Sequence, residues 1–176
     1  MWTLRKKGIE MINLSYKLLS PSASVPYLAT SGSACMDVCA HLLETSEIKY
    51  YSSTYHNPQT RKVEGGMVRF EKGDRMMVPT GLVLNIPEGH CVRVYPRSGN
   101  AIKRGFQLCN SVGIIDSDYR QEVMILLYNS GLETFISHGE RIAQLELVPV
   151  LQPNLVEVNE IVDAGTERTG GFGSTG

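Results

Sequence analysis

Short runs of alternating apolar and polar residues recur along most of this chain. Successive side chains of a β-strand point to opposite faces of its sheet, so alternation with a period of two predicts half-buried strands. The runs that show it, many of them rich in β-branched residues, cover positions 13–18, 67–70, 76–86, 92–95, 123–128, 134–136 and 142–150.

Turn-forming residues separate the predicted strands. They stand as KGD at 72–74, PEG at 87–89, NSG at 129–131 and HGE at 138–140. Short strands joined by such turns are typical of an all-β sandwich or barrel.

One segment, SGNAIKRG at 98–105, predicts one or two turns of helix instead. Ser98 can cap its start, helix-tolerant residues follow, and Gly105 can end it. A helix that begins there would aim Ser98 and the nearby amides at an anion.

Three stretches fall outside this pattern, which leaves residues 11–164 as one domain with an insertion. Residues 1–10 are basic and patternless and are interpreted as an N-terminal extension. Residues 44–66, rich in Ser, Tyr, Thr and Asn, predict an inserted surface hairpin or loop. Residues 165–176 hold five glycines and one large apolar side chain, Phe172, so we expect a flexible arm, either a loose end or a segment that orders on a ligand.

Composition narrows the function mainly by exclusion. Seventeen Lys and Arg against eighteen Asp and Glu give no global attraction to nucleic acid or to an anionic membrane, so any phosphate site must be local. No apolar stretch is long enough to span a bilayer, and the first ten residues lack the apolar core of a signal peptide, so a cytoplasmic location is expected. The four cysteines lack CxxC pairs, which favours reduced, mostly buried thiols over a zinc site.

Two segments in the middle of the chain carry candidate chemistry. In GIIDSDYR (113–120) a turn can hold Asp116 towards a cavity while Asp118 points elsewhere, although two such aspartates are also common at hairpin tips. YPRSGNAIKRG (95–105) combines Arg97, Ser98 and the amides near Gly99, the ingredients of phosphate binding without a P-loop.

Two later segments are weaker signals on their own. GERIAQL (139–145) reads as a turn that enters a strand. ERTGGFGSTG (167–176) could wrap a phosphorylated ligand with Phe172 stacked on a base, or it could be plain flexible tail. Lys103, Arg104 and Arg120 are interpreted as solvated surface charges.

Taken together and in this order, these segments resemble the trimeric dUTPase family, which is known for five short motifs. The counterparts are GSACMDVCA at 32–40, YPRSGNAIKRG, CNSVGIIDSDYRQEV at 109–123, GERIAQL and ERTGGFGSTG. The resemblance covers roughly residues 13–176, and five ordered motifs are far more specific than any one of them.

The resemblance implies a role for each motif. Asp37 would hold the cofactor, Mg²⁺, through water, and Asp116 would be the catalytic residue that activates the attacking water. Asn110 would read uracil, Tyr119 would pack under the deoxyribose, and Phe172 would cover the base. The other implied substrate contacts are Ile114, Ile115, Met124 and Gly173, together with Arg97, Ser98, Gly99, Gln144 and Arg168 on the phosphates.

The same resemblance implies the fold and the reaction. The fold would be a jelly-roll-like β-barrel that assembles as a homotrimer with shared active sites. The reaction would be hydrolysis of dUTP to dUMP and pyrophosphate by attack at the α-phosphorus, which keeps uracil out of DNA and supplies dUMP for thymidylate synthesis. Neither membrane association nor direct nucleic-acid binding is expected.

The chain departs from the family pattern at three motifs. Cys35 and Met36 stand where a glycine and a tyrosine usually precede the aspartate, and Asn100 replaces an apolar residue in the second motif. In the fifth motif only Thr169 separates Arg168 from the glycine pair, where the family usually has two residues. This shortening bears on how far Arg168 can reach.

Two other functions stay open at this level. The dCTP deaminases resemble dUTPases in fold and in the PRSG segment, but their catalytic glutamate would fall where this chain has Leu126, which cannot shuttle a proton. A nucleotide-sensing regulatory protein could keep the nucleotide site and act through the 44–66 insertion. Intact Asp37, Asp116 and Tyr119 favour an active enzyme over a pure binder.

Overall fold

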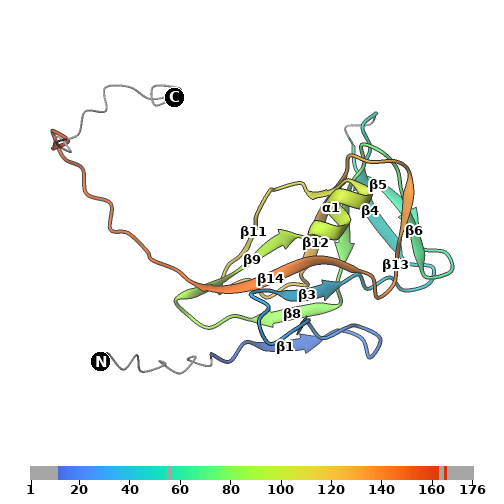
Figure 1. The fold of residues 1–176 in the computed structure, drawn as a ribbon, viewed down its shortest axis with the longest axis horizontal. Helices are drawn as coiled ribbons and strands as arrows, with labels where there is room; N and C mark the ends of the chain where they lie inside the picture. The colour runs from blue at the N-terminus through green and yellow to red at the C-terminus, as the bar shows by residue number, and fades with distance from the viewer. Residues whose placement is uncertain (1–11, 55–56, 163–164, 166–176) are drawn as a thin grey trace, which may run out of the picture.

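The structure of the protein is a computed structural model that describes residues 12–54, 57–162 and 165. Within these residues, short strands and one short helix build an all-β, jelly-roll-like barrel (Figure 1). Every pairing among the described strands is antiparallel. The predicted fold class is therefore confirmed for the barrel, whereas the predicted C-terminal arm lies outside the described residues.

Two five-stranded sheets form most of the barrel. The first has the order β10-β12-β7-β4-β5 and contains β10 (Phe106–Leu108), β12 (Met124–Asn129), β7 (Arg75–Pro79), β4 (Glu47–Tyr51) and β5 (Gln59–Lys62). The second has the order β11-β9-β14-β3-β2 and contains β11 (Gly113–Ile115), β9 (His90–Pro96), β14 (Arg141–Pro149), β3 (Met36–Cys39) and β2 (Tyr27–Leu28).

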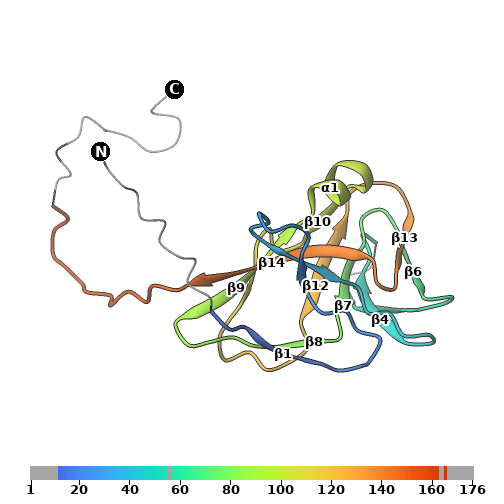
Figure 2. The same cartoon turned by 60° about the horizontal axis from the view of Figure 1, so that its bottom comes forward.

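Two smaller sheets complete the body. One pairs β1 (Ser15–Leu18) with β8 (Leu82–Asn85), and the other pairs β13 (Thr134–Ser137) with β6 (Met67–Phe70). Figures 1 and 2 show β1 and β8 lying together at one side of the barrel, away from β13 and β6.

The core follows from the alternation in the sequence. Along β12, Ile125 and Leu127 are buried while the residues between them are partly exposed, and β6 buries Val68 and Phe70 in the same way. Phe70 packs edge to face against Phe106, with ring centroids 5.1 Å apart. Full burial of one such side chain stabilises the fold by roughly 1.5–3 kcal/mol.

The prediction of a single strand over 76–86 is wrong, because the chain turns between β7 and β8. Gly81 lies in this turn with φ of 66°, a left-handed conformation that side chains rarely adopt. A Cβ atom at Gly81 would lie 2.6 Å from the Cβ atom of Ala23. Apolar residues on both sides of Gly81 conceal the break in the pattern.

The insertion at 44–66 forms the β4–β5 hairpin at one edge of the first sheet. It is attached to the barrel by more than its ends, since Ile48 is buried in the core. Arg61 also reaches inward, where its Nη1 lies 2.7 Å from Asp74 Oδ2 and its guanidinium stacks 4.1 Å from the centre of the Tyr50 ring. The hairpin is therefore part of the packed structure.

The helix α1 (Ser98–Arg104) lies within the predicted segment and ends, as predicted, at Gly105, whose φ is 72°. The predicted cap is wrong, because Ser98 is already helical. Arg97, with an extended backbone (φ −90°, ψ 127°), is the N-cap and makes no capping hydrogen bond through its side chain.

The interpretation of Arg104 as a solvated surface charge is also wrong. Its guanidinium pairs with Glu140, donates to the Phe135 carbonyl and stacks 4.2 Å from the centre of the Phe106 ring. Arg104 thus ties the end of α1 to the β13–β14 turn.

After β14 the chain runs away from the barrel, as both views show for residues 151–162 (Figures 1 and 2). This segment leaves large apolar side chains in solvent, including Leu151, Ile161 and Val162, which are 94%, 87% and 90% exposed. Across the described part of the chain, no helix has the length and apolar character needed to cross a membrane.

Candidate active site

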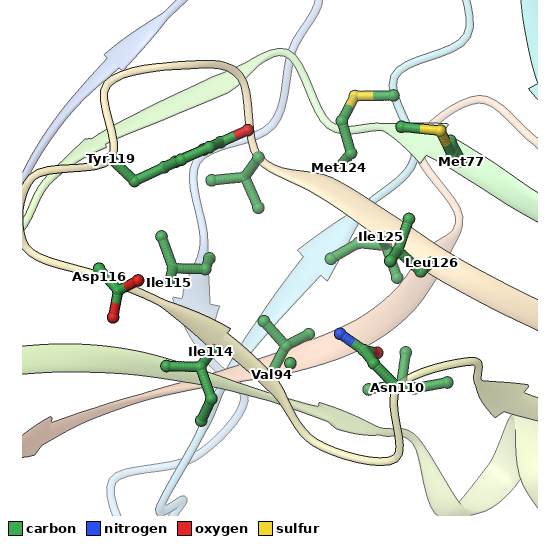
Figure 3. Close-up of a pocket in the computed structure, with 13 residues that line it drawn as sticks. Met77, Val94, Asn110, Ile114, Ile115, Asp116, Tyr119, Met124, Ile125 and Leu126 are labelled. Atoms are coloured by element: carbon green, nitrogen blue, oxygen red, sulfur yellow. The ribbon is translucent and has the colours of Figure 1, made fainter.

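A cavity of about 290 Å³ opens beside β11 and the start of β12 (Figure 3). Six of the predicted site residues line it: Asn110, Ile114, Ile115, Asp116, Tyr119 and Met124. Apolar side chains that were not predicted as substrate contacts complete the wall, namely Met77, Val94, Leu108, Val123, Ile125 and Leu126. The cavity is therefore an apolar slot with a few polar groups at its edge, as expected of a small-molecule site.

One side of the cavity is the turn between β10 and β11, which connects the two five-stranded sheets. This turn holds Ser111 at φ of 60°, an uncommon conformation for a residue with a side chain. Gly113 is buried, and a Cβ atom there would lie 3.0 Å from the Cβ atom of Val94 and 3.2 Å from Asn110 Nδ2. The absent side chain at Gly113 thus leaves room for the Asn110 amide against β9.

The opposite side is the loop that carries Asp116 and Tyr119. Figure 3 shows the Tyr119 ring across the cavity from Asn110, with Asp116 at the rim near Ile115. The Tyr119 hydroxyl donates a hydrogen bond to the Glu122 carbonyl at 3.0 Å, and the Tyr119 amide donates to the Asp116 carbonyl at 3.2 Å. Both bonds hold the loop in a closed turn.

The two aspartates of this loop face different surroundings. Asp116 lines the apolar cavity and also a second, more polar one, whereas Asp118 lines only the second. This agrees with the expectation that Asp116 faces a cavity while Asp118 points elsewhere. His90, whose ring Nδ1 contacts the Glu88 carbonyl at 3.1 Å, lines the polar cavity too.

A separate cluster surrounds Asp37 on β3. Arg97 Nε donates to Asp37 Oδ1 at 2.9 Å, Arg141 Nη1 donates to Oδ2 at 3.0 Å, and Gln144 Nε2 donates to Oδ1 at 3.2 Å. The Asp37 side chain is only 3% exposed. Strand pairing creates the cluster, since β14 sets Gln144 opposite Asp37 and Arg141 opposite Cys39.

The electrostatics of this cluster favour the charged carboxylate. Burial alone would raise the pKa of Asp37, but the hydrogen bond and charge of Arg97, with the hydrogen bonds from Arg141 and Gln144, hold the pKa below its ordinary value of 3.8. Arg141 was missed by the sequence reasoning, although it stands inside GERIAQL.

The remaining second-motif residues lie at the surface beside this cluster. Ser98 and Gly99 are exposed at the start of α1, and a side chain at Gly99 would meet nothing within 4 Å. Asn100, one of the departures from the family pattern, donates from Nδ2 to the Arg141 carbonyl at 2.9 Å. Asn100 thus fastens α1 to β14, a contact that an apolar residue could not make.

The predicted site is not assembled within one described chain. The cavity that holds Asn110, Asp116 and Tyr119 is not lined by the described residues that were expected to contact the phosphates, namely Arg97, Ser98, Gly99 and Gln144. The predicted contacts Arg168, Phe172 and Gly173 lie outside the described residues. One chain therefore presents two separate parts, an apolar cavity and a cationic cluster.

The Asp37 cluster fits magnesium only if a water molecule lies between the carboxylate and the ion. Ionised carboxylates offer about four lone-pair positions, and three donors already contact Asp37. Direct ligation is thus disfavoured, while one position remains for a water molecule. No group of three or more His, Cys, Asp or Glu side chains in residues 12–54, 57–162 and 165 could hold a metal ion, so magnesium would also need ligands from a bound phosphate chain.

Comparison with known proteins gives a consistent result. A family model described as dUTPase matches residues 67–176. A deoxyuridine 5'-triphosphate nucleotidohydrolase of Hydrogenobaculum sp. is 37% identical over 94% of this chain and 99% of its own length. Another, from Methylocella silvestris, is 51% identical over 64% of this chain and 70% of its own length.

Solved structures agree at the level of the fold. A mutant dUTPase of Staphylococcus bacteriophage 80alpha, described with dUpNHpp, is 23% identical, covers 94% of this chain and 99% of its own, and superimposes with a TM-score of 0.72. A dUTPase from phage phi11 of S. aureus, described with a structural Mg(II) ion, is 20% identical, covers 85% of this chain and 98% of its own, and has a TM-score of 0.66.

Proposed function

The chain belongs to the dUTPase family, and from that premise we propose that it hydrolyses dUTP to dUMP and pyrophosphate. The observation that carries the proposal is the convergence of Asn110, Tyr119 and Asp116 on one apolar cavity. An amide, an aromatic ring and a carboxylate in that order match a base, a sugar and a reacting phosphate.

The pyrimidine would enter between the β10–β11 turn and the start of β12. The Asn110 amide and neighbouring backbone groups supply hydrogen bonds to uracil, while Ile114, Ile115 and Met124 supply apolar contacts. The Tyr119 ring would lie under the deoxyribose and leave no room for a 2′-hydroxyl. This arrangement would select the deoxynucleotide.

Asp116 is the proposed catalytic base. Its exposed carboxylate at the rim of the cavity can accept a proton from a water molecule aligned with the α-phosphorus, with pyrophosphate as the leaving group. Arg97, Ser98, Gly99 and Gln144 would contact the phosphates, and Arg168, Phe172 and Gly173 would cover the nucleotide. Asp37 would hold magnesium through water, and the bound ion would neutralise phosphate charge.

A homotrimer with shared sites would bring these parts together. Two features support it: the cavity and the Asp37 cluster are separate within one chain, and the segment 151–162 exposes apolar side chains that a neighbouring chain could cover. Sedimentation of the intact protein should then give three times the chain mass of 19.5 kDa. A monomer at working concentration would contradict the assembly. A cytoplasmic location remains part of the proposal.

The function is tested by a panel of nucleotides. Purified protein is incubated with dUTP, dCTP, dTTP or UTP and magnesium, and both pyrophosphate and ammonia are measured. Pyrophosphate from dUTP alone is expected. Ammonia from dCTP would instead indicate a deaminase, which Leu126 on the cavity wall disfavours, and binding of dUTP without any product would indicate a regulatory binding protein.

A further inference from the structure

Glu122 stands just before β12, at the end of the loop that carries Asp116 and Tyr119. Its side chain does not line the apolar cavity of Asn110, Asp116 and Tyr119 (the nucleotide cavity). It lies at a different cavity of about 370 Å³, together with His41, Glu47 and Lys49. Glu122 is therefore absent from the wall of the cavity that holds Asn110, so we expect any effect that it has on the reaction to pass through other residues.

Two hydrogen bonds connect Glu122 to the sugar side of the nucleotide cavity and to the barrel. Its backbone carbonyl accepts the Tyr119 hydroxyl at 3.0 Å, and its Oε1 accepts the Gly81 amide at 2.7 Å. Glu122 thus links the Tyr119 ring, which is proposed to contact deoxyribose, with the turn between β7 and β8.

That turn is a firm attachment point. The Gly81 carbonyl accepts the Leu19 amide at 2.8 Å, and the Pro79 carbonyl accepts the His41 amide at 2.8 Å. Gly81 is also closely surrounded, because an added Cβ atom would lie 2.6 Å from Ala23 and 2.9 Å from the His41 ring. The Gly81 amide therefore has little freedom to follow a moving loop.

The start of β12 has its own attachments, independent of the Glu122 side chain. Val123 donates its amide to the Leu82 carbonyl at 2.7 Å, and Thr80 Oγ1 donates to the Val123 carbonyl at 2.6 Å. Removal of the Glu122 carboxylate should therefore leave the strand in register. What it should release is Glu122 itself, whose carbonyl holds Tyr119.

We infer that Glu122 is a positioning residue for sugar selection: its carboxylate, bonded to the Gly81 amide, fixes the carbonyl that holds the Tyr119 ring over the nucleotide cavity. The inference rests on the proposed function, in which Tyr119 contacts deoxyribose. A ring that is free to tilt makes room for a 2′-hydroxyl, so loss of the Glu122 bond should relax discrimination between dUTP and UTP.

The test measures kcat/KM for dUTP and for UTP in four forms of the full chain. Glu122→Ala should lower the dUTP preference on the order of tenfold, the factor that corresponds to a typical charge-assisted hydrogen bond. Glu122→Gln, whose amide oxygen can still accept the Gly81 amide, should restore most of the preference. Gln121→Ala, at the exposed neighbouring position, should behave like the unmodified protein.

A double-mutant cycle separates this role from a general loss of structure. Tyr119→Phe keeps the ring but removes the hydroxyl that Glu122 holds, so it should lower the preference by a factor similar to that of Glu122→Ala. If both act through one bond, the double variant should be no worse than either single variant. Tyr119→Phe and Glu122→Gln also test the inference if Glu122→Ala does not fold.

The outcomes are distinguishable from failure of the proposed function. If the unmodified protein does not hydrolyse dUTP, the proposed function itself is wrong. If it does, an unchanged dUTP preference in Glu122→Ala would overturn the inference, as would factors that multiply in the double variant or a Glu122→Gln variant as impaired as Glu122→Ala.

Discussion

The carboxylate of Asp37 and the guanidinium of Arg97 are joined by a 2.9 Å contact from Oδ1 to Nε, on a side chain that is only 3% exposed. The pairing connects β3 to the residue that precedes α1, 60 positions later in the sequence. An aspartate so placed does two things at once: it holds the ends of β3, β9 and β14 together, and it orients Arg97.

This relationship predicts how stability depends on pH. The pKa of Asp37 is lower in the folded protein than its ordinary value of 3.8, so its contribution to the free energy of unfolding is complete above that value and is lost as pH falls through the lower, folded pKa. Denaturant unfolding should show this loss as pH is lowered from 6 through the folded pKa of Asp37. The Asp37→Asn variant should have a lower free energy of unfolding at pH 6, and this free energy should change less with pH below about pH 4. An equally steep pH dependence in that variant would show that a group other than Asp37 causes the loss of stability.

Asp116→Asn tests the proposed base. The change keeps the size and polarity of the side chain but removes its ability to take a proton, so turnover should fall by roughly 10² to 10⁴. Affinity for a non-hydrolysable dUTP analogue, measured by calorimetry, should change little. The matched control is Asp118→Asn, whose side chain lines the neighbouring polar cavity and not the nucleotide cavity. A parallel loss of affinity in Asp116→Asn would make that residue a binding group.

Arg61→Met tests how the insertion is attached. The Arg61 and Asp74 side chains are 13% and 2% exposed, and removal of one partner from such a buried pair costs about 3–5 kcal/mol because the other charge stays unpaired. Urea unfolding at fixed protein concentration should show this loss. Arg69→Met, on a side chain 50% exposed, should cost under about 1 kcal/mol. Equal losses for the two variants would contradict the proposed difference.

Truncation after Ala164 tests the C-terminal arm. The buried core reaches no further along the described chain than Leu145, so the barrel should keep its circular dichroism spectrum and melting behaviour. Most turnover should be lost, since the arm is proposed to exclude water from the phosphates. Phe172→Ala should approach the rate of the truncated protein, whereas Thr169→Ala should not. Near-normal turnover in a folded truncation would show that the arm is dispensable.

The sequence predicted best where neighbouring residues determine structure. Alternation is enough for β6 and β12, because every second residue faces the core. It failed for β5, whose sequence QTRK is polar throughout and becomes a strand only by pairing with β4. It failed also for β3, where Asp37 lies among apolar neighbours that are buried at consecutive positions. Tertiary pairing, and not local preference, decides such strands.

In the candidate site too, residues close together in the sequence could be predicted, whereas partners far apart in the sequence could not. Asn110, Asp116 and Tyr119 lie within ten residues and could be assigned from the motif, and the structure brings them to one cavity. The contact between Glu122 and Gly81 spans 41 positions, and that between Arg104 and Glu140 spans 36. Nothing local in the sequence marks such partners, which is why Arg104 was interpreted as a surface charge.

The separation of the cavity from the Asp37 cluster has a genetic consequence. In the proposed trimer, the carboxylate that activates water and the arginine that meets the phosphates of the same nucleotide would come from different chains. Two alleles, one defective at Asp116 and the other at Arg97, would each be null alone. Expressed together, they would form mixed trimers in which some sites draw both intact groups from different subunits, so the two alleles would complement each other.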